Sequence, residues 1–315
     1  MAIKSDNLNL NLNLNLGAAA SGAGASGGRA RFNTEDFPKL ARLPQPPTAT
    51  DDNFQAFPAF GHRDEWDAEN RAWAHLAEFV EPIAGGGSDR GPFSPWLTYV
   101  QSVLDGGPMA ARCPAGPNKK MATVDDLNAD IAMMVDLSLD RGDRLQEIVD
   151  QADGEGAINY WTGMLALNPA KQPNTHLLIR VGRKIGELVV MRLKDLYKCP
   201  RPSRIHPLLV PAIDPPDTPS YPSGHATQAY LISRLLIRAI DPGGAPSPPA
   251  HLKDGTVRRA LKLLADRVAE NRTVAGLHFI ADNLAGEEVA EKCVRRAMHC
   301  TSISNLVAAA AAEHA

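Results

Sequence analysis

The fold is decided by the stretch NTHLLIRVGRKIGELVVMRLKDLY, which runs from Asn174 to Tyr197. Asn174 is a candidate N-cap, and Pro200 and Pro202 stop the helix beyond Tyr197. The apolar residues recur every three or four positions and fall on one helix face, namely Leu178, Val181, Ile185, Leu188 and Val189. The stretch therefore predicts one long amphipathic helix with a buried side.

Similar patterns recur on both sides of this stretch. Further helices are expected over residues 64–80, 96–104, 124–149 (as one or two helices), 226–240, 256–275 and 281–297, before an Ala-rich C-terminal tail. Ser94-Pro95 is typical of an N-cap followed by proline in the first helical turn. The aromatic residues Trp66, Trp73 and Phe79 are expected in the core. Strand-like alternation is almost absent beyond the first residues, so the predicted fold class is an all-α helical bundle.

Composition and charge narrow the classes of function. The chain has 315 residues, and 33 Lys plus Arg against 36 Asp plus Glu give a formal net charge of −3. Without a basic excess, nucleic acid is not an expected partner. No stretch reaches the roughly 18 uncharged apolar residues of a transmembrane segment. We expect a soluble protein. No ordinary secretory signal follows Lys4, which favours the cytoplasm, and the oligomeric state is not indicated.

The first thirty residues are of low complexity. Residues 7–16 alternate Asn and Leu, and residues 17–28 contain only Gly, Ala and Ser, so this segment cannot bury enough apolar surface to offset its ordering entropy. Gly22, Gly24 and Gly27 match the dinucleotide-binding pattern GxGxxG. We reject that interpretation because polar residues and a Pro-rich loop follow, where an amphipathic helix is required.

The four cysteines are Cys113, Cys199, Cys293 and Cys300, and their spacing does not fit a CxxC metal site or a dense disulfide framework. Cys293 and Cys300 are seven residues apart and fit one helix face. Because cysteine behaves as a small buried hydrophobe, we expect free thiols in the core.

Three polar clusters carry the candidate chemistry. In chain order they are Lys194 with Arg201-Pro202, then Pro222-Ser223-Gly224-His225, then Arg272 with His278 and Asp282. Each cluster alone also has an ordinary structural explanation: a solvated helix end, a Ser N-cap with an incidental His, and a surface His–Asp pair.

Together the clusters supply the groups that bind a tetrahedral oxyanion. Ser223 and Gly224 precede a predicted helix, where free backbone N–H groups and the helix dipole favour an anion, and His225 is placed to deliver a proton there. Asp282, one helical turn from His278, would accept one ring N–H and leave the other nitrogen as a nucleophile or ligand. The anion's oxygens would be held by Lys194, Arg201 and Arg272.

At these residues the sequence resembles the type 2 phosphatidic acid phosphatase and vanadium haloperoxidase superfamily, whose signature is K-x6-RP, PSGH and SR-x5-H-x3-D. Lys194–Pro202, Pro222–His225 and Arg272–Asp282 match it in order at ten fixed positions, and Asn271 stands where the family has Ser. The match covers under a third of the chain. The family's helical bundle agrees with the expected all-α fold.

The resemblance implies a role for each matching residue. His278 is the nucleophile that forms a phosphohistidine, or the vanadate ligand in a haloperoxidase. Asp282 orients His278, and His225 is the general acid and then the general base. The oxyanion is bound by Lys194, Arg201, Ser223, Gly224 and Arg272.

Positions beside the motifs bear on the choice between the two activities. Thr218 stands where fungal chloroperoxidases have Phe and algal bromoperoxidases have His, and Met191 stands where chloroperoxidases have Trp. The 45 residues between His225 and Asn271 fall in the phosphatase range. Tyr221, before the PSGH motif, resembles the haloperoxidases instead.

We therefore expect an acid phosphatase that hydrolyses small phosphate monoesters through a phosphohistidine, without a divalent metal or other cofactor. The alternative is a vanadate-dependent haloperoxidase that uses halide, hydrogen peroxide and an organic acceptor. A third interpretation is a non-catalytic oxyanion-binding bundle. The expected organisation is a disordered tail at residues 1–30, a loop-rich helical region at 31–120 and a helical catalytic core at 121–315.

Overall fold

A computed structural model describes residues 67–107, 109–113, 116, 123–241 and 256–314. All of these belong to one compact unit, Gly61–Ala315. The predictions for the low-complexity tail, the GxGxxG match and Trp66 lie outside the described residues. Within them the structure is helical, and the β-type pairing is limited to one bridge between Ile83 and Gly91, so the all-α prediction is confirmed.

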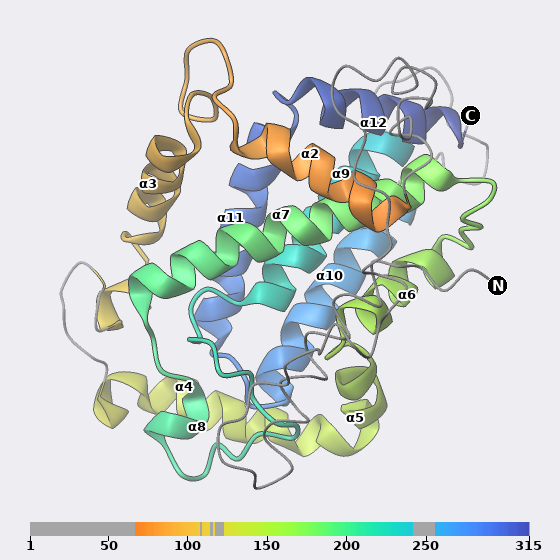
Figure 1. The fold of residues 1–315 in the computed structure, drawn as a ribbon. Coiled ribbons are helices and arrows are strands. Elements are labelled where there is room, and N and C mark those ends of the chain that lie inside the picture. Colours follow the sequence, from red (N-terminus) through yellow and green to blue (C-terminus); the bar gives the residue numbers. More distant parts are fainter. Residues whose placement is uncertain (1–66, 108, 114–115, 117–122, 242–255, 315) are drawn as a thin grey trace, which may run out of the picture. The chain divides into compact units, whose positions relative to one another are not determined.

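The helices follow one another along the chain, and a long irregular segment joins α8 to α9 (Figure 1). They are α2 (Ala68–Val80), α3 (Phe93–Leu104), α4 (Val124–Leu137), α5 (Arg141–Asp150), α6 (Gly154–Met164), α7 (Pro173–Tyr197), α8 (Pro202–Ile205), α9 (Gly224–Ile240), α10 (Thr256–Val274), α11 (Ile280–Ala297) and α12 (Thr301–Ala312), with 3-10 turns at Ala110–Arg112 and Ser138–Asp140.

Helix α9 is the centre of the bundle, because α7, α10, α11 and α12 all pack against it. Helix α2 lies along α7, and α3 contacts α11. The core is built from the predicted apolar faces, and Leu178, Val181, Ile185 and Val189 of α7 are fully buried. Among the described residues, no helix is long and apolar enough to cross a membrane.

Helix α7 begins at Pro173 rather than after the predicted N-cap Asn174. Proline suits the first helical position because its φ angle is already helical and it has no N–H to satisfy. The free N–H groups of Asn174 and Thr175 donate to the Glu313 carboxylate at 2.7 and 2.8 Å. A distant acidic side chain therefore caps this helix.

Two local predictions were wrong. Helix α3 begins at Phe93, directly after Pro92, so Ser94 is inside the helix and not its N-cap. Trp73 is 54% exposed, although it was expected in the core. Its ring covers the Lys184 ammonium, 4.2 Å from the ring centroid, and Lys184 is in turn ion-paired with Glu69. A cation–π contact thus replaces core packing at this position.

The prediction of free cysteines was wrong for one pair. Cys113 and Cys199, 86 residues apart, form a disulfide. Both lie in irregular segments that the bundle brings within a Cα–Cα distance of 4.8 Å, which local spacing does not show. Cys293 and Cys300 are free and buried, as predicted. Burial raises the pKa of the Cys300 thiol to about 12, which keeps it protonated and unreactive.

Candidate active site

The three polar clusters meet at one pocket of about 300 Å³, here called the motif pocket. Lys194 comes from the last turns of α7, Arg201 from the residue before α8, and His225 from the start of α9. His278 lies in the connection between α10 and α11. The pocket is lined by Ala152, Arg183, Glu187, Val190, Met191, Lys194, Arg201, Pro216, Thr218, Gly224, His225, Gln228, Leu277 and His278.

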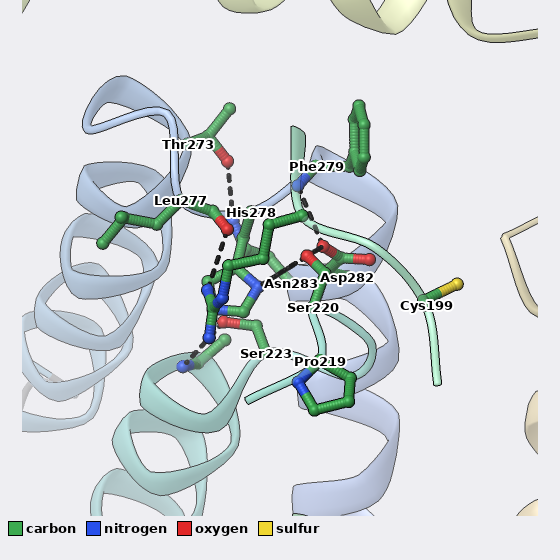
Figure 2. Close-up of polar contacts among 12 residues, drawn as sticks. Cys199, Pro219, Ser220, Ser223, Thr273, Leu277, His278, Phe279, Asp282 and Asn283 are labelled. Carbon is green, nitrogen blue, oxygen red and sulfur yellow. Dashed lines mark hydrogen bonds and ion pairs between the residues drawn. The ribbon is translucent and has the colours of Figure 1, made fainter. Parts of the chain in front are cut away.

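His278 is buried and held by hydrogen bonds on both ring nitrogens (Figure 2). Its Nδ1 lies 3.3 Å from Asp282 Oδ2 and 3.3 Å from Ser220 Oγ. Its Nε2 lies 3.3 Å from Arg201 Nη1, which can only donate. We therefore assign the proton to Nδ1 and a lone pair to Nε2, which is the tautomer that a nucleophile or ligand requires.

The charge state of His278 agrees with this assignment. Burial lowers the pKa of His278 well below its ordinary value, and the nearby cations Lys194 and Arg201 lower it further. The ring is therefore neutral near pH 7. Burial also favours the neutral form of Asp282 and raises its pKa to about 6. The hydrogen bonds from Ser220 and from the Phe279 N–H lower this pKa but do not cancel the effect of burial.

Asp282 connects His278 to the rest of the site. Its Oδ2 accepts from Ser220 Oγ at 2.5 Å and from the Phe279 N–H at 3.0 Å. The second of these bonds satisfies a free N–H at the start of α11. Its backbone carbonyl accepts from the Ser223 N–H at 3.0 Å, which ties the start of α9 to α11. One residue thus orients His278 and fixes two helix ends.

Two cations, Arg201 and Lys194, line the pocket, and the acceptors of their hydrogen bonds are uncharged. The Arg201 guanidinium donates to the carbonyls of Pro216, Thr218 and Leu277 at 2.9–3.0 Å and to Thr218 Oγ1 at 3.1 Å. Lys194 Nζ donates to the Pro219 carbonyl and lies 3.4 Å from that of Ser220. Burial and the neighbouring Arg201 lower the pKa of Lys194 to about 7.

Arg272 is the third cation, and it is fully buried behind the lining residues. Its Nη2 donates to the Ile148 carbonyl at 3.1 Å and to Gln151 Oε1 at 3.2 Å. Its Nε and Nη1 have no hydrogen-bond partner in the described part of the chain. Burial lowers the pKa of Arg272 to about 10, so the side chain stays charged near neutral pH.

The electrostatic balance of the site favours an anion. Lys194 and Arg201 lie near one buried carboxylate, Asp282, while the third buried cation, Arg272, keeps N–H donors without acceptors. Uncompensated buried charge is costly, so a bound anion would stabilise the site. The three cations were predicted as oxyanion ligands, and the structure brings them together.

The start of α9 contributes in two ways. Ser223 is buried and its Oγ accepts from the Ala226 N–H at 3.5 Å, so its hydroxyl serves as the helix N-cap. Gly224 and His225 line the pocket, whereas Ser223 does not. A Cβ at Gly286 of α11 would lie 2.9 Å from the Ser223 carbonyl. The glycine therefore permits the close approach that sets the position of the α9 start.

His225 lies across the pocket as a half-buried side chain. Burial lowers the pKa of His225 to about 3, and the charges of Arg272 and Lys194 act in the same direction, while a hydrogen bond to the Gln151 backbone opposes them. His225 is therefore neutral when the pocket contains no anion. Negative charge bound beside it would raise its pKa.

The sequence reasoning missed two residues of the site. Ser220 bonds both Asp282 and His278, and its position three residues before Ser223 in the same loop was the available signal. Gln151 contacts Arg272 and His225 from a distant helix end, and nothing in its local sequence indicated this. Among the described residues, no group of three or more His, Cys, Asp or Glu side chains could hold a metal ion.

Comparison with known proteins adds no family assignment: no protein-family model matches the chain, and no curated protein sequence matches it.

Proposed function

We propose that the protein is an acid phosphatase that hydrolyses small phosphate monoesters through a phosphohistidine at His278. The observation that carries this proposal is the neutral His278 ring, whose Nε2 lies beside Arg201 in a pocket lined by Lys194 and Arg201, with Arg272 buried behind the lining residues. Asp282 and Ser220 bind the opposite ring nitrogen and so keep Nε2 unprotonated. The resemblance of the three motifs to the type 2 phosphatidic acid phosphatase superfamily supports the same chemistry.

The first step would transfer the phosphoryl group to the protein. His278 Nε2 forms a bond to phosphorus while the ester P–O bond breaks, and His225 gives its proton to the leaving alcohol oxygen. Lys194, Arg201 and Arg272 stabilise the charge on the phosphoryl oxygens. Asp282 stabilises the imidazolium character that develops at His278.

The second step would release phosphate. His225, now neutral, takes a proton from water, the oxygen of which attacks phosphorus as the P–N bond to His278 breaks. His225 must therefore be protonated when the ester binds. The dianionic ester supplies this condition, because its negative charge next to His225 raises the low pKa of that ring.

The test is release of phosphate from p-nitrophenyl phosphate by the purified chain, with EDTA present. His278→Ala should lose the activity, because no other group can attack phosphorus from that position. His206→Ala is the matched control, since His206 does not line the motif pocket, and it should keep full activity. Equal turnover in wild type and His278→Ala would refute the proposal.

The same pocket also supports the alternative, vanadate-dependent haloperoxidase activity. His278 Nε2 would be the ligand of vanadium, and the three cations would hold the vanadate oxygens, because vanadate has the shape of the phosphoryl transition state. Thr218 bonds Arg201 where the haloperoxidases have an aromatic or His side chain, which favours the phosphatase. Bromide oxidation with peroxide and orthovanadate, measured on the same preparation, decides between them. A bundle that shows neither activity would support the third interpretation.

The localisation of the protein stays a prediction: the disulfide Cys113–Cys199 is typical of oxidising compartments and argues against the cytoplasm that the sequence favours.

A further inference from the structure

A buried amide cluster lies behind the motif pocket, where the end of α5 meets α10. Gln151 is fully buried, and its Oε1 accepts from Asn271 Nδ2 at 3.0 Å and from Arg272 Nη2 at 3.2 Å. Asn271 Nδ2 also donates to Glu147 Oε2 at 2.8 Å. Glu147 in turn pairs with Arg267 at 2.7 Å. The cluster therefore runs without a break from a surface ion pair to Arg272.

Gln151 contacts two groups of the site at once. Its side chain binds the Arg272 guanidinium, and its backbone forms a hydrogen bond with the His225 ring. The next residue, Ala152, lines the motif pocket. Arg272, which is proposed to bind the oxyanion, and His225, which is proposed to protonate the leaving group, are thus both held by Gln151.

The geometry of the contact determines which Arg272 donors remain available. A guanidinium is planar, so fixing one nitrogen also fixes the directions of the others. Gln151 and the Ile148 carbonyl occupy Nη2, and the unpartnered donors are Nε and Nη1. Those donors are the ones that an oxyanion can take.

The uncharged state of Gln151 matters as much as its position. A carboxylate at this site would pair with Arg272 and cancel its positive charge, whereas an amide oxygen orients the guanidinium and leaves the charge in place. The nearby carboxylate, Glu147, is already paired with Arg267 and reaches Gln151 only through Asn271.

We propose that Gln151 is a positioning residue that orients Arg272, and through its backbone His225, for binding of a phosphate-like oxyanion. The proposal rests on the proposed function, since that function supplies the anion. It assigns a role to a helix end that lies outside all three motifs.

The experiment measures orthovanadate binding by the full chain, together with kcat and KM for p-nitrophenyl phosphate, in two matched variants. Gln151→Leu removes the acceptor for Arg272. Gln146→Leu makes the same change on the same helix, where the exposed side chain donates to Asp150 and, in the described structure, contacts no residue of the motif pocket. Gln151→Leu should weaken vanadate binding about tenfold and lower kcat/KM by a similar factor, while Gln146→Leu should match wild type.

A third variant separates positioning from folding. Gln151→Glu has nearly the same shape and retains an acceptor, but its carboxylate would neutralise Arg272. It should bind vanadate more weakly than Gln151→Leu near pH 7.5 and recover affinity as the pH falls and the new carboxyl group is protonated. A purely structural role would lower the melting temperature of the variants and leave vanadate affinity and its pH dependence unchanged, which would overturn the proposal.

The two proposals fail in different ways. A wild-type chain that binds vanadate but releases no phosphate would refute the hydrolysis, while the affinities of the Gln151 variants would still test positioning. A wild-type chain that hydrolyses the ester and shows equal vanadate affinity in all Gln151 variants would refute the positioning role alone. A wild-type chain that binds no vanadate would refute both.

Discussion

Two regions of the molecule bury an arginine without an ion-pair partner among the described residues, and they differ in what surrounds the guanidinium. Arg296 of α11 donates to the carbonyls of Phe79, Glu81 and Gly91 at 2.9–3.1 Å. Its guanidinium carbon also lies 5.2–5.8 Å from the ring centroids of Phe79, Phe93 and Trp96. Three carbonyls and three aromatic rings thus surround this cation and link α11 to the end of α2 and the start of α3, and among the described residues only its Nη1 has no hydrogen-bond partner.

Arg272 is equally buried, but only its Nη2 has acceptors. No aromatic ring covers it in the described structure, and it lies behind a pocket lined by two histidines. A buried arginine is therefore not by itself an anion site. Arg296 keeps one nitrogen without a hydrogen-bond partner, Nη1, and Arg272 keeps two, Nε and Nη1. Only Arg272 lies behind the motif pocket, and this position distinguishes the arginine that awaits a ligand from the one that holds the fold together.

The same substitution at both positions should therefore have opposite effects. Arg272→Met keeps the side-chain volume and removes the charge and the unused donors. It should lower kcat/KM by about 10²–10³-fold, as expected for loss of one oxyanion donor, with little change in the free energy of unfolding. Steady-state kinetics and urea unfolding would measure both quantities. Retained kcat/KM in a folded Arg272→Met variant would remove Arg272 from the site.

Arg296→Met should show the reverse pattern. It removes the donor to the Phe79 and Glu81 carbonyls and one of the two donors to the Gly91 carbonyl, so the free energy of unfolding should fall by about 3 kcal/mol. Vanadate affinity of the folded variant should stay within about twofold of wild type, because Arg296 lies outside the motif pocket. A large loss of vanadate affinity at unchanged stability would break the distinction between the two arginines.

A smaller effect concerns the pH dependence of kcat/KM. The motif pocket contains a cation, Lys194, that loses its charge near neutral pH, whereas Arg296 stays charged there. The lowered pKa of Lys194, about 7, means that its charge is present below pH 7 and lost above it. The raised pKa of Asp282, about 6, means that its carboxylate is lost below pH 6. Because His225 must also be protonated, and its pKa in the free protein is about 3, kcat/KM should fall with rising pH, most steeply above about pH 7, where Lys194 also loses its charge.

Lys194→Arg tests the alkaline side of this profile. An arginine stays charged throughout the range, so the part of the decline above pH 7 that comes from Lys194 should disappear, even if the larger head group lowers the overall rate. An unchanged alkaline limb in this variant would show that another group titrates there.

Local sequence patterns were enough to predict the positions of most helices, because amphipathic spacing and proline determine helix formation and helix ends over only a few residues. The spacing of Lys194 from Arg201 and of His278 from Asp282 also predicted a shared oxyanion site, and the structure places these side chains together. The assignments that depend on function, such as the nucleophilic role of His278, stay predictions.

The remaining features depend on contacts between distant segments. Gln151 meets Arg272 across 121 residues, Cys113 meets Cys199 across 86, and Glu313 caps Asn174 across 139. Nothing near these residues in the sequence specifies their partners, because the packing of the helices brings them together. The prediction that Trp73 lies in the core was wrong for a related reason. Its periodicity assigns it to a helix face, but its neighbour on that face is the charged Lys184.

The most direct test of a phosphohistidine at His278 is to trap it. The protein is quenched with base during turnover of p-nitrophenyl phosphate, and the phosphoryl group is mapped by mass spectrometry under conditions that preserve phosphohistidine. The phosphoryl group should be found on His278, and it should be absent from His278→Ala. Turnover with no phosphoryl group on His278, or with the group on another residue, would contradict the proposed phosphohistidine mechanism.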